Sequence, residues 1–301
     1  MLRLGLIGAG RWGKVYLQTI ERMADRLKVV RVATSKPEGS WKEVAASPDC
    51  DAVIIATPAP LHAEMARACL EAGKPVIVEK PLCFDTATAR SLEQLAKKSG
   101  LPMLVNYIHL YNPAYRALKQ AVADSGKPVR AILSEGMDLG PFRPDTGTLW
   151  DRCPHDVALC LDLMGASGAG AEVSAFGAFP DSQGRPEMVT LRLRWKSGVT
   201  AWIQSGRLSP QKRRTLSVIT DTELFHFDEH SSTRCRRIPF DPAGRKEDKP
   251  IPVPDRPTPM EGMLAAFADQ VDKKTPPDGL GLTVELTRVL EECDKLLTCV
   301  S

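Results

Sequence analysis

Short apolar runs alternate with longer amphipathic runs up to about residue 125, and this alternation predicts strands and helices in turn. Parallel strands joined in this way need right-handed crossovers with helices on both faces, so a doubly wound open sheet is expected. The predicted strands are Leu2–Ile7, Lys28–Ala33, Ala52–Ala56, Pro75–Val78 and Pro102–Val105. The predicted helices are Gly13–Asp25, Pro60–Glu71, Thr86–Lys98 and Asn112–Ser125.

After residue 128 the pattern changes to longer strands of alternating polarity joined by Gly and Pro turns. This pattern predicts an α+β domain with a largely antiparallel open sheet that helices cover on one face. We therefore expect two domains, 1–125 and 126–301. Strands are predicted at Val189–Trp195, Val199–Ser205 and Arg214–Ile219, and closing helices at Met260–Lys273 and Leu282–Leu297.

Composition narrows the classes of partner. The 301 residues carry a net charge of +3, which is too small to favour nucleic acid or an anionic membrane. The basic run at 211–214, with the arginines at 234, 236 and 237, has no interleaved aromatics and is interpreted as a solvated face. The cysteines form no C-x-x-C pair or zinc-spaced cluster, so no metal is expected, and reduced thiols in a cytoplasmic protein are the consistent interpretation.

A glycine loop follows the first predicted strand directly. Gly8, Gly10 and Gly13 form a G-x-G-x-x-G motif, with Arg11 and Trp12 between them, at the start of an amphipathic helix. In this context Gly8 permits the tight turn, Gly10 allows the backbone to approach a pyrophosphate, and Gly13 lets helix and strand pack closely. The motif predicts a Rossmann domain in which these five residues bind a dinucleotide.

The residue that reads the adenosine ribose in this fold lies ~20 residues beyond the glycines. Thr34, Ser35 and Lys36 stand there, with no carboxylate among them. Hydroxyls and a lysine can hold a 2′-phosphate, whereas an acidic residue would bind the 2′-hydroxyl and repel the phosphate. NADP is therefore favoured, and NAD stays open because Glu38 lies close by.

Two further segments resemble a known family. The run Ala56-Thr57-Pro58-Ala59-Pro60-Leu61-His62, and the Glu79-Lys80-Pro81 element after Ala72-Gly73-Lys74, are similar to the glucose–fructose oxidoreductase, inositol dehydrogenase and rhizopine-catabolism (Gfo/Idh/MocA) family. The resemblance continues through Thr148 to Asp156 and a closing helix near Gly281. It implies a two-domain dehydrogenase of sugars or cyclitols.

The resemblance also implies which residues surround the nicotinamide, at the carboxyl ends of the parallel strands, where ligands of open α/β sheets bind. Glu79 and Lys80 would lie beside the nicotinamide ribose and the substrate. The other residues implied to face the cofactor are Thr57, Pro58, His62 and Asn106.

Oxidising a secondary alcohol requires hydride transfer and a positioned base for the hydroxyl proton. Lys80 can stabilise the developing alkoxide with its ammonium, or act as the base if burial disfavours its charge. His155 is the second candidate, because an imidazole exchanges a proton near neutrality. The resemblance assigns the base to His155 and a substrate contact to Asp151, and the choice between Lys80 and His155 stays open.

The remaining substrate candidates are Tyr107 and His109, and Arg152 with Arg143. Packing explains the aromatic side chain of Tyr107 equally well. The two arginines can bind a carboxylate or diphosphate. The Trp-Asp and Pro-His-Asp form of this region resembles enzymes that oxidise the 3-hydroxyl of nucleotide-linked sugars. The chain departs from the commoner family pattern, which has Gly at the place of Cys153 and an acid at that of Ala158.

The leading hypothesis is an NAD(P)-dependent dehydrogenase or reductase of a sugar, nucleotide sugar or cyclitol hydroxyl. One alternative is an NAD-dependent glycosidase on the same fold, in which the cofactor stays bound and a transient ketone assists elimination. The other is a non-catalytic dinucleotide sensor, an option suggested by Arg152 and Cys153. In the family that the chain resembles, open sheets with one uncovered face often pair, so the resemblance implies a homodimer or homotetramer.

Overall fold

A computed structural model describes residues 1–34, 40–142, 146–275, 279–297 and 299–300 of the protein. They form two compact units, one of Met1–Ile108 with Thr258–Thr287 and one of His109–Pro257 with Arg288–Ser301. The division expected between residues 125 and 126 stays a prediction. The helix expected near Asn112–Ser125 lies in the second unit, and the segment from Thr258 lies in the first.

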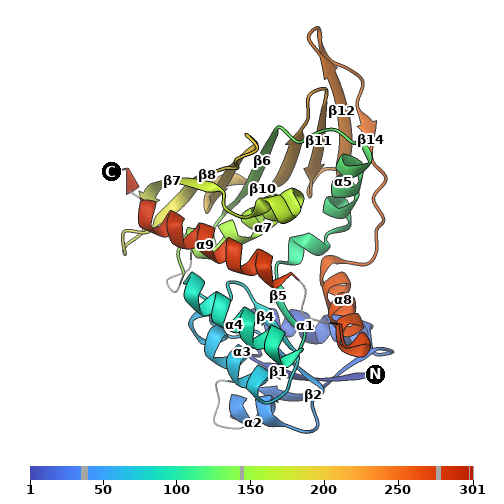
Figure 1. Ribbon diagram of the computed structural model, residues 1–301, viewed down its shortest axis with the longest axis vertical. Helices are drawn as coiled ribbons and strands as arrows, with labels where there is room; N and C mark the ends of the chain where they lie inside the picture. Colours follow the sequence, from blue (N-terminus) through green and yellow to red (C-terminus); the bar gives the residue numbers. More distant parts are fainter. Residues whose placement is uncertain (35–39, 143–145, 276–278, 298, 301) are drawn as a thin grey trace. The chain divides into compact units, whose positions relative to one another are not determined.

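The sheet of the first unit has the strand order β2-β1-β3-β4-β5, and its paired strands run parallel (Figure 1). Residues of β3, β4 and β5 are buried throughout, as expected of central strands covered on both faces. The predicted doubly wound sheet is therefore confirmed. Its strands are β1 (Leu2–Ile7), β2 (Leu27–Ala33), β3 (Ala52–Ile55), β4 (Val76–Glu79) and β5 (Met103–Asn106).

Helices of the first unit follow their strands closely. A helix that was not predicted, α2 (Trp41–Ala46), begins where the Ser40 side chain accepts a hydrogen bond from the Lys42 amide. Near α1, α8 begins with a Thr258 and Glu261 capping box. The helices are α1 (Arg11–Arg22), η1 (Ala59–Leu61), α3 (His62–Glu71), α4 (Thr86–Ser99) and α8 (Pro259–Lys273), while α9 (Leu280–Leu296) belongs to both units.

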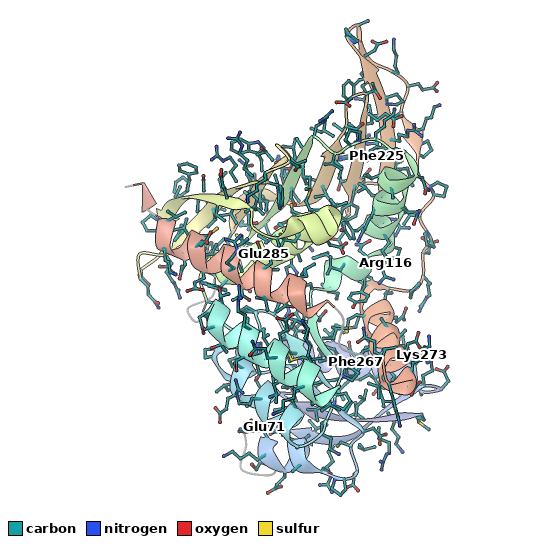
Figure 2. The ribbon with its side chains drawn as sticks, viewed as in Figure 1. Glu71, Arg116, Phe225, Phe267, Lys273 and Glu285 are labelled. Atoms are coloured by element: carbon teal, nitrogen blue, oxygen red, sulfur yellow. The ribbon has the colours of Figure 1, made fainter. Side chains whose placement is uncertain are left out.

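Ion pairs show why α8 belongs with the first unit. Arg22 near the end of α1 lies 3.6 Å from Glu261, and Arg26 lies 2.6 Å from Asp269. Phe267 of α8, labelled in Figure 2, is 1% exposed. The segment after Thr258 therefore completes the hydrophobic core of the first unit, although some 150 residues of the chain separate it from residue 108.

The second unit is built on a mixed sheet with the strand order β13-β12-β11-β10-β6-β9-β8-β7-β15. Most neighbours are antiparallel, while β6 with β9 and β15 with β7 are parallel, so the predicted largely antiparallel sheet is confirmed. Its strands are β6 (Ala131–Leu139), β7 (Glu172–Pro180), β8 (Pro186–Arg194), β9 (Thr200–Gly206), β10 (Leu208–Ile219), β11 (Glu223–Asp228), β12 (Cys235–Asp241), β13 (Gly244–Arg245), β14 (Lys249–Pro250), which pairs with β12, and β15 (Cys299–Val300).

Helices cover one face of this sheet. Helix α7 packs against β6 and β9, and α5 packs against β11 and β12, where Phe225, labelled in Figure 2, is fully buried. No helix in the described part of the chain is long and apolar enough to cross a membrane. The helices are η2 (Ile108–Tyr111), α5 (Pro113–Asp124), α6 (Thr148–Asp151), α7 (Cys153–Met164) and η3 (Gly165–Gly168).

Candidate active site

The glycine loop joins β1 to α1, and each glycine meets a different requirement. Gly8 has a φ of +99°, and a Cβ there would lie 2.5 Å from the carbonyl oxygen of Ala56 after β3. A Cβ on Gly13 would collide with the Gly8 carbonyl oxygen, so α1 packs tightly on the turn. A Cβ on Gly10 would meet nothing within 4 Å, so the loop is open at that position.

The N-terminus of α1 carries no side-chain cap in the structure. Gly10 is the N-cap, no acidic residue lies in the first turn, and Arg11 is exposed while Trp12 is half-buried. The first N–H groups and the helix dipole therefore favour an anion beside the open position at Gly10. Thr34 is exposed at the end of β2, whereas Ser35 and Lys36 lie outside the described residues.

The carboxyl ends of β3, β4 and β5 bring several predicted residues to one edge of the sheet. Glu79 pairs with Asn106 in the register of β4 and β5. Thr57, which is half-buried, follows β3, and Lys80, also half-buried, follows Glu79. The parallel order therefore brings together the residues implied to face the nicotinamide within the first unit, with Pro58 exposed at the same edge.

Glu79 is held by a buried network to which Tyr16 of α1 contributes. Its Oε1 accepts hydrogen bonds from the Tyr16 hydroxyl at 2.9 Å and the Asn106 amide at 2.7 Å, and the amide also donates to Tyr16. Burial raises the pKa of Glu79, against the effect of these donors and of the Lys80 charge. Sequence reasoning missed Tyr16, although it lies on the buried face of α1 with Ile20.

His62, implied to face the cofactor, begins α3 and is 1% exposed. Its Nδ1 lies 2.7 Å from the carbonyl oxygen of Pro81, and its Nε2 lies 2.8 Å from that of Thr57. The ring therefore contacts two segments that carry predicted site residues. Its cofactor role stays a prediction.

His155 lies in the first turn of α7 in the second unit, beside another histidine. The rings of His155 and His109 meet edge to face, with centroids 4.8 Å apart and planes at 89°. Asp151 ends α6, so Asp151 and His155 lie on the successive helices α6 and α7 with Arg152 between them. The second unit thus places His109 against His155, with Asp151 and Arg152 just before His155 in the chain.

A buried arginine that sequence reasoning missed orients Asp151. Arg207 is fully buried and its Nη2 lies 3.0 Å from Asp151 Oδ2, while its Nη1 lies 3.4 Å from Glu187 Oε2. Arg152 lies 3.9 Å from the same Asp151 oxygen and donates to the Gly140 carbonyl, and burial lowers its pKa. Arg207 directly follows β9. Continuing the alternation of buried and exposed positions along β9 to residue 207 is the only sequence signal for its burial.

Asp156 anchors α7 to the sheet next to His155. It is fully buried, and its Oδ1 accepts from Arg214 Nη1 at 2.7 Å and from the Ser134 hydroxyl at 2.8 Å. Its Oδ2 accepts from the Ser205 hydroxyl at 2.8 Å. A Cβ on Gly136 would lie 2.7 Å from Arg214 Nη1, so a glycine leaves room for the pair. The interpretation of residues 211–214 as a solvated face is wrong for Arg214.

Two predicted residues have less informative positions. Tyr107 belongs to the first unit and is 3% exposed, where burial raises the pKa of its hydroxyl. Its burial is compatible with packing, and its substrate role stays a prediction. Arg143 lies outside the described residues.

The residues of the first unit fit a nicotinamide dinucleotide. Gly10 leaves space at an anion-favouring helix end, where a pyrophosphate would bind. Asn106 Oδ1, in a side chain 2% exposed at the end of β5, has no hydrogen-bond partner in the described part of the chain and can accept one from a ligand. Glycine loop and strand ends therefore offer contacts for both halves of the cofactor.

Comparisons with known proteins agree with this geometry. Residues 2–107 match the GFO_IDH_MocA family, described as an oxidoreductase family with an NAD-binding Rossmann fold. The chain is 35% identical to a protein of known structure from Magnetospirillum magnetotacticum MS-1 that is described as an oxidoreductase; the superposition has a TM-score of 0.86 and covers 97% of this chain and 99% of that one.

Two relatives have named activities. The chain is 29% identical to the 1,5-anhydro-D-fructose reductase of Ensifer adhaerens over 67% of this chain and 68% of that protein. It is 28% identical to the UDP-N-acetylglucosamine 3-dehydrogenase of Acidithiobacillus ferrooxidans over 72% of this chain and 71% of that protein. Both proteins are thus named for oxidation or reduction of sugar derivatives.

Proposed function

Because this chain belongs to the Gfo/Idh/MocA family of oxidoreductases with an NAD-binding Rossmann fold, we propose that it exchanges hydride with a secondary hydroxyl or ketone of a sugar, nucleotide sugar or cyclitol. The family makes the chain an NAD(P)-dependent oxidoreductase. The observation that carries the proposal is that the first unit has both an open glycine loop and a lysine, Lys80, at the carboxyl end of β4. The names of the two sugar-active relatives support the substrate class.

In the proposed reaction, the residues of this chain position the substrate and handle its proton. The bound nicotinamide supplies a hydride acceptor or donor. The Lys80 ammonium stabilises negative charge on the substrate oxygen, and His155 exchanges the hydroxyl proton. Asp151, oriented by Arg207, accepts a hydrogen bond from a neighbouring hydroxyl. Arg152 is proposed to bind an anionic substituent, and His109 and Tyr107 to line the substrate site.

A substrate panel tests this proposal. Purified protein is mixed with NAD or NADP and with free sugars, inositols and UDP-linked sugars, and the corresponding ketones are tested with the reduced cofactors. We expect a change in nicotinamide absorbance with at least one class. Silence of every combination, in protein shown to bind a dinucleotide, would contradict the proposal.

The proposed cofactor preference is NADP, and it depends on Thr34, Ser35 and Lys36. In Lys36→Glu protein we expect the ratio of NADP to NAD affinity to fall by about tenfold or more, because a charge-assisted contact to the 2′-phosphate becomes a repulsion. Titration of both cofactors by fluorescence measures the ratio. Lys28→Glu, at the exposed start of β2, is the matched control. An unchanged ratio in Lys36→Glu protein would show that the ribose is read elsewhere.

We also propose a homodimer or homotetramer formed through the sheet face opposite α7. Leu133 of β6 and Trp202 of β9 are register partners on that face, and they are 42% and 45% exposed. Phe176 of β7 lies on the same face and is 61% exposed. An apolar group of this kind on one face is typical of a protein interface.

Location in the cytoplasm stays a prediction.

Trp202→Glu tests this interface. A charge at its centre would have to be desolvated against apolar side chains, so we expect the molar mass in solution to fall, and to reach that of one chain if the wild type is a dimer. Light scattering during size-exclusion chromatography measures the mass. Phe84→Glu, an exposed aromatic of the first unit, should leave the mass unchanged. A wild-type monomer, or the same mass in both variants and wild type, would contradict the proposal.

A further inference from the structure

His62 lies between two backbone carbonyls that belong to different segments of the first unit. Thr57 follows β3, and Pro81 follows Lys80 after β4. The ring nitrogens lie 2.8 Å and 2.7 Å from the two carbonyl oxygens, and the side chain is 1% exposed. The imidazole therefore bridges the segment that carries Lys80 and the segment that carries Thr57.

The distances determine the orientation of the ring. A flipped imidazole ring would place carbon atoms next to the two carbonyl oxygens. Such C–H···O contacts are about 3.3–3.6 Å long, which is longer than both observed distances. A carbonyl oxygen only accepts, and a neutral imidazole has a single N–H to donate. Both bonds therefore exist together only when both ring nitrogens carry a proton.

The surroundings of His62 oppose that second proton. Burial lowers the pKa of His62 below its ordinary value of 6.5, while the two carbonyl groups act in the opposite direction. The Lys80 ammonium is the charged group acting on the ring within the described residues, and it also lowers the pKa. Near neutrality the ring is thus mainly neutral and donates to one carbonyl at a time.

We propose that His62 is a positioning residue that holds the Lys80 segment through Nδ1 or the Thr57 segment through Nε2, according to which nitrogen carries its one proton near neutrality. The inference rests on the proposed function, in which Lys80 acts at the reacting oxygen and Thr57 faces the cofactor. The two contacts serve different steps. The Pro81 bond places the amine for chemistry, and the Thr57 bond shapes the cofactor site.

Two conservative variants separate these contacts. The amide of Asn places a donor near the position of Nδ1, and that of Gln near the position of Nε2. His62→Gln should therefore keep the Thr57 bond and lose the Pro81 bond, so that kcat falls about three- to tenfold at unchanged cofactor affinity. His62→Asn should do the reverse and raise the cofactor Kd about three- to tenfold, with a smaller change in kcat.

The measurements include one that needs no turnover. Cofactor Kd is obtained by fluorescence titration, kcat with saturating cofactor, and folding by thermal melting. His226→Gln is the control, because His226 is a partly buried histidine of the second unit whose Nδ1 lies 2.8 Å from the Ser217 hydroxyl. It should leave kcat and Kd unchanged. Equal effects of His62→Gln and His62→Asn would overturn the proposal. So would a lower melting temperature in both variants if neither one affected kcat and cofactor Kd differently.

Nuclear magnetic resonance of wild-type protein with 15N-labelled histidine tests the same geometry if the variants fail to fold. We expect a ring with slowly exchanging N–H protons, one near neutrality and two below its lowered pKa. A freely exchanging ring that titrates at 6.5 would overturn the proposal. If Lys80→Met retained full kcat, the proposed function would fail, whereas the Kd increase in His62→Asn would still report the Thr57 contact.

Discussion

Lys80→Met protein is expected to turn over about 10²- to 10³-fold more slowly than wild type, with cofactor affinity nearly preserved. The ammonium is proposed to act where charge develops on the substrate oxygen, and an interaction of that kind lowers the barrier without contributing equally to ground-state binding. Methionine keeps the length and apolar stem of the side chain. Lys80 lies between buried Glu79 and buried Pro81, so the backbone should be little disturbed.

Single-turnover absorbance of the nicotinamide measures the chemical step, and fluorescence titration measures cofactor Kd. The matched control is Lys97→Met, since Lys97 is an exposed lysine of the same unit that pairs with Glu93 at 2.8 Å on α4. It should match wild type in both quantities, because an exposed pair contributes little. If Lys80→Met mainly weakened cofactor binding, the amine would hold the dinucleotide and not the reacting oxygen.

Asp156→Ala protein is expected to lose about 3–5 kcal/mol of free energy of unfolding in its second unit. The substitution leaves the guanidinium of Arg214, a residue that is 7% exposed, without its carboxylate, and it removes the acceptor of two serine hydroxyls. A buried uncompensated charge costs more than the pair gains. Because α7 begins beside Asp156 and carries His155, we also expect lower activity in the protein that remains folded.

Denaturant unfolding followed by fluorescence measures this loss, since Trp150, Trp195 and Trp202 all lie in the second unit. Arg130 and Asp221 offer a close control, with the same residue types at the same 2.7 Å separation but with both side chains more than half exposed. Asp221→Ala should cost less than about 1 kcal/mol. Losses of similar size in the two variants would show that Asp156 does not anchor α7.

The fold was largely predictable because hydrophobic periodicity reports burial directly. The helix predicted over Thr86–Lys98 runs from Thr86 to Ser99, and the first strand agrees at both ends. The short helix α2 was missed because its six residues span less than two turns and show little periodicity. The place of the segment from Thr258 was not predictable, because amphipathic pattern does not say which sheet a helix will cover.

The candidate site was predictable only where a sequence motif is required by one particular backbone conformation. The glycine loop is recognisable because φ, close packing and open space each demand glycine. Arg207 and Arg214 escaped because basic residues are usually solvated and their carboxylate partners are distant in sequence. For Arg214 a signal existed, since it alternates with Leu216 and Val218 on the buried face of β10, whereas Arg213 beside it is half exposed.

The pairing of α1 with α8 sets the order in which the polypeptide can mature. During synthesis, the dinucleotide-binding sheet leaves the ribosome early, but Glu261 and Asp269 emerge only after strands β6 to β14 of the mixed sheet have been made. Until then Arg22 and Arg26 lack these acidic partners, and Phe267 cannot enter its place in the core. A nascent chain therefore cannot finish its first unit before His109–Pro257 of the second one has been translated.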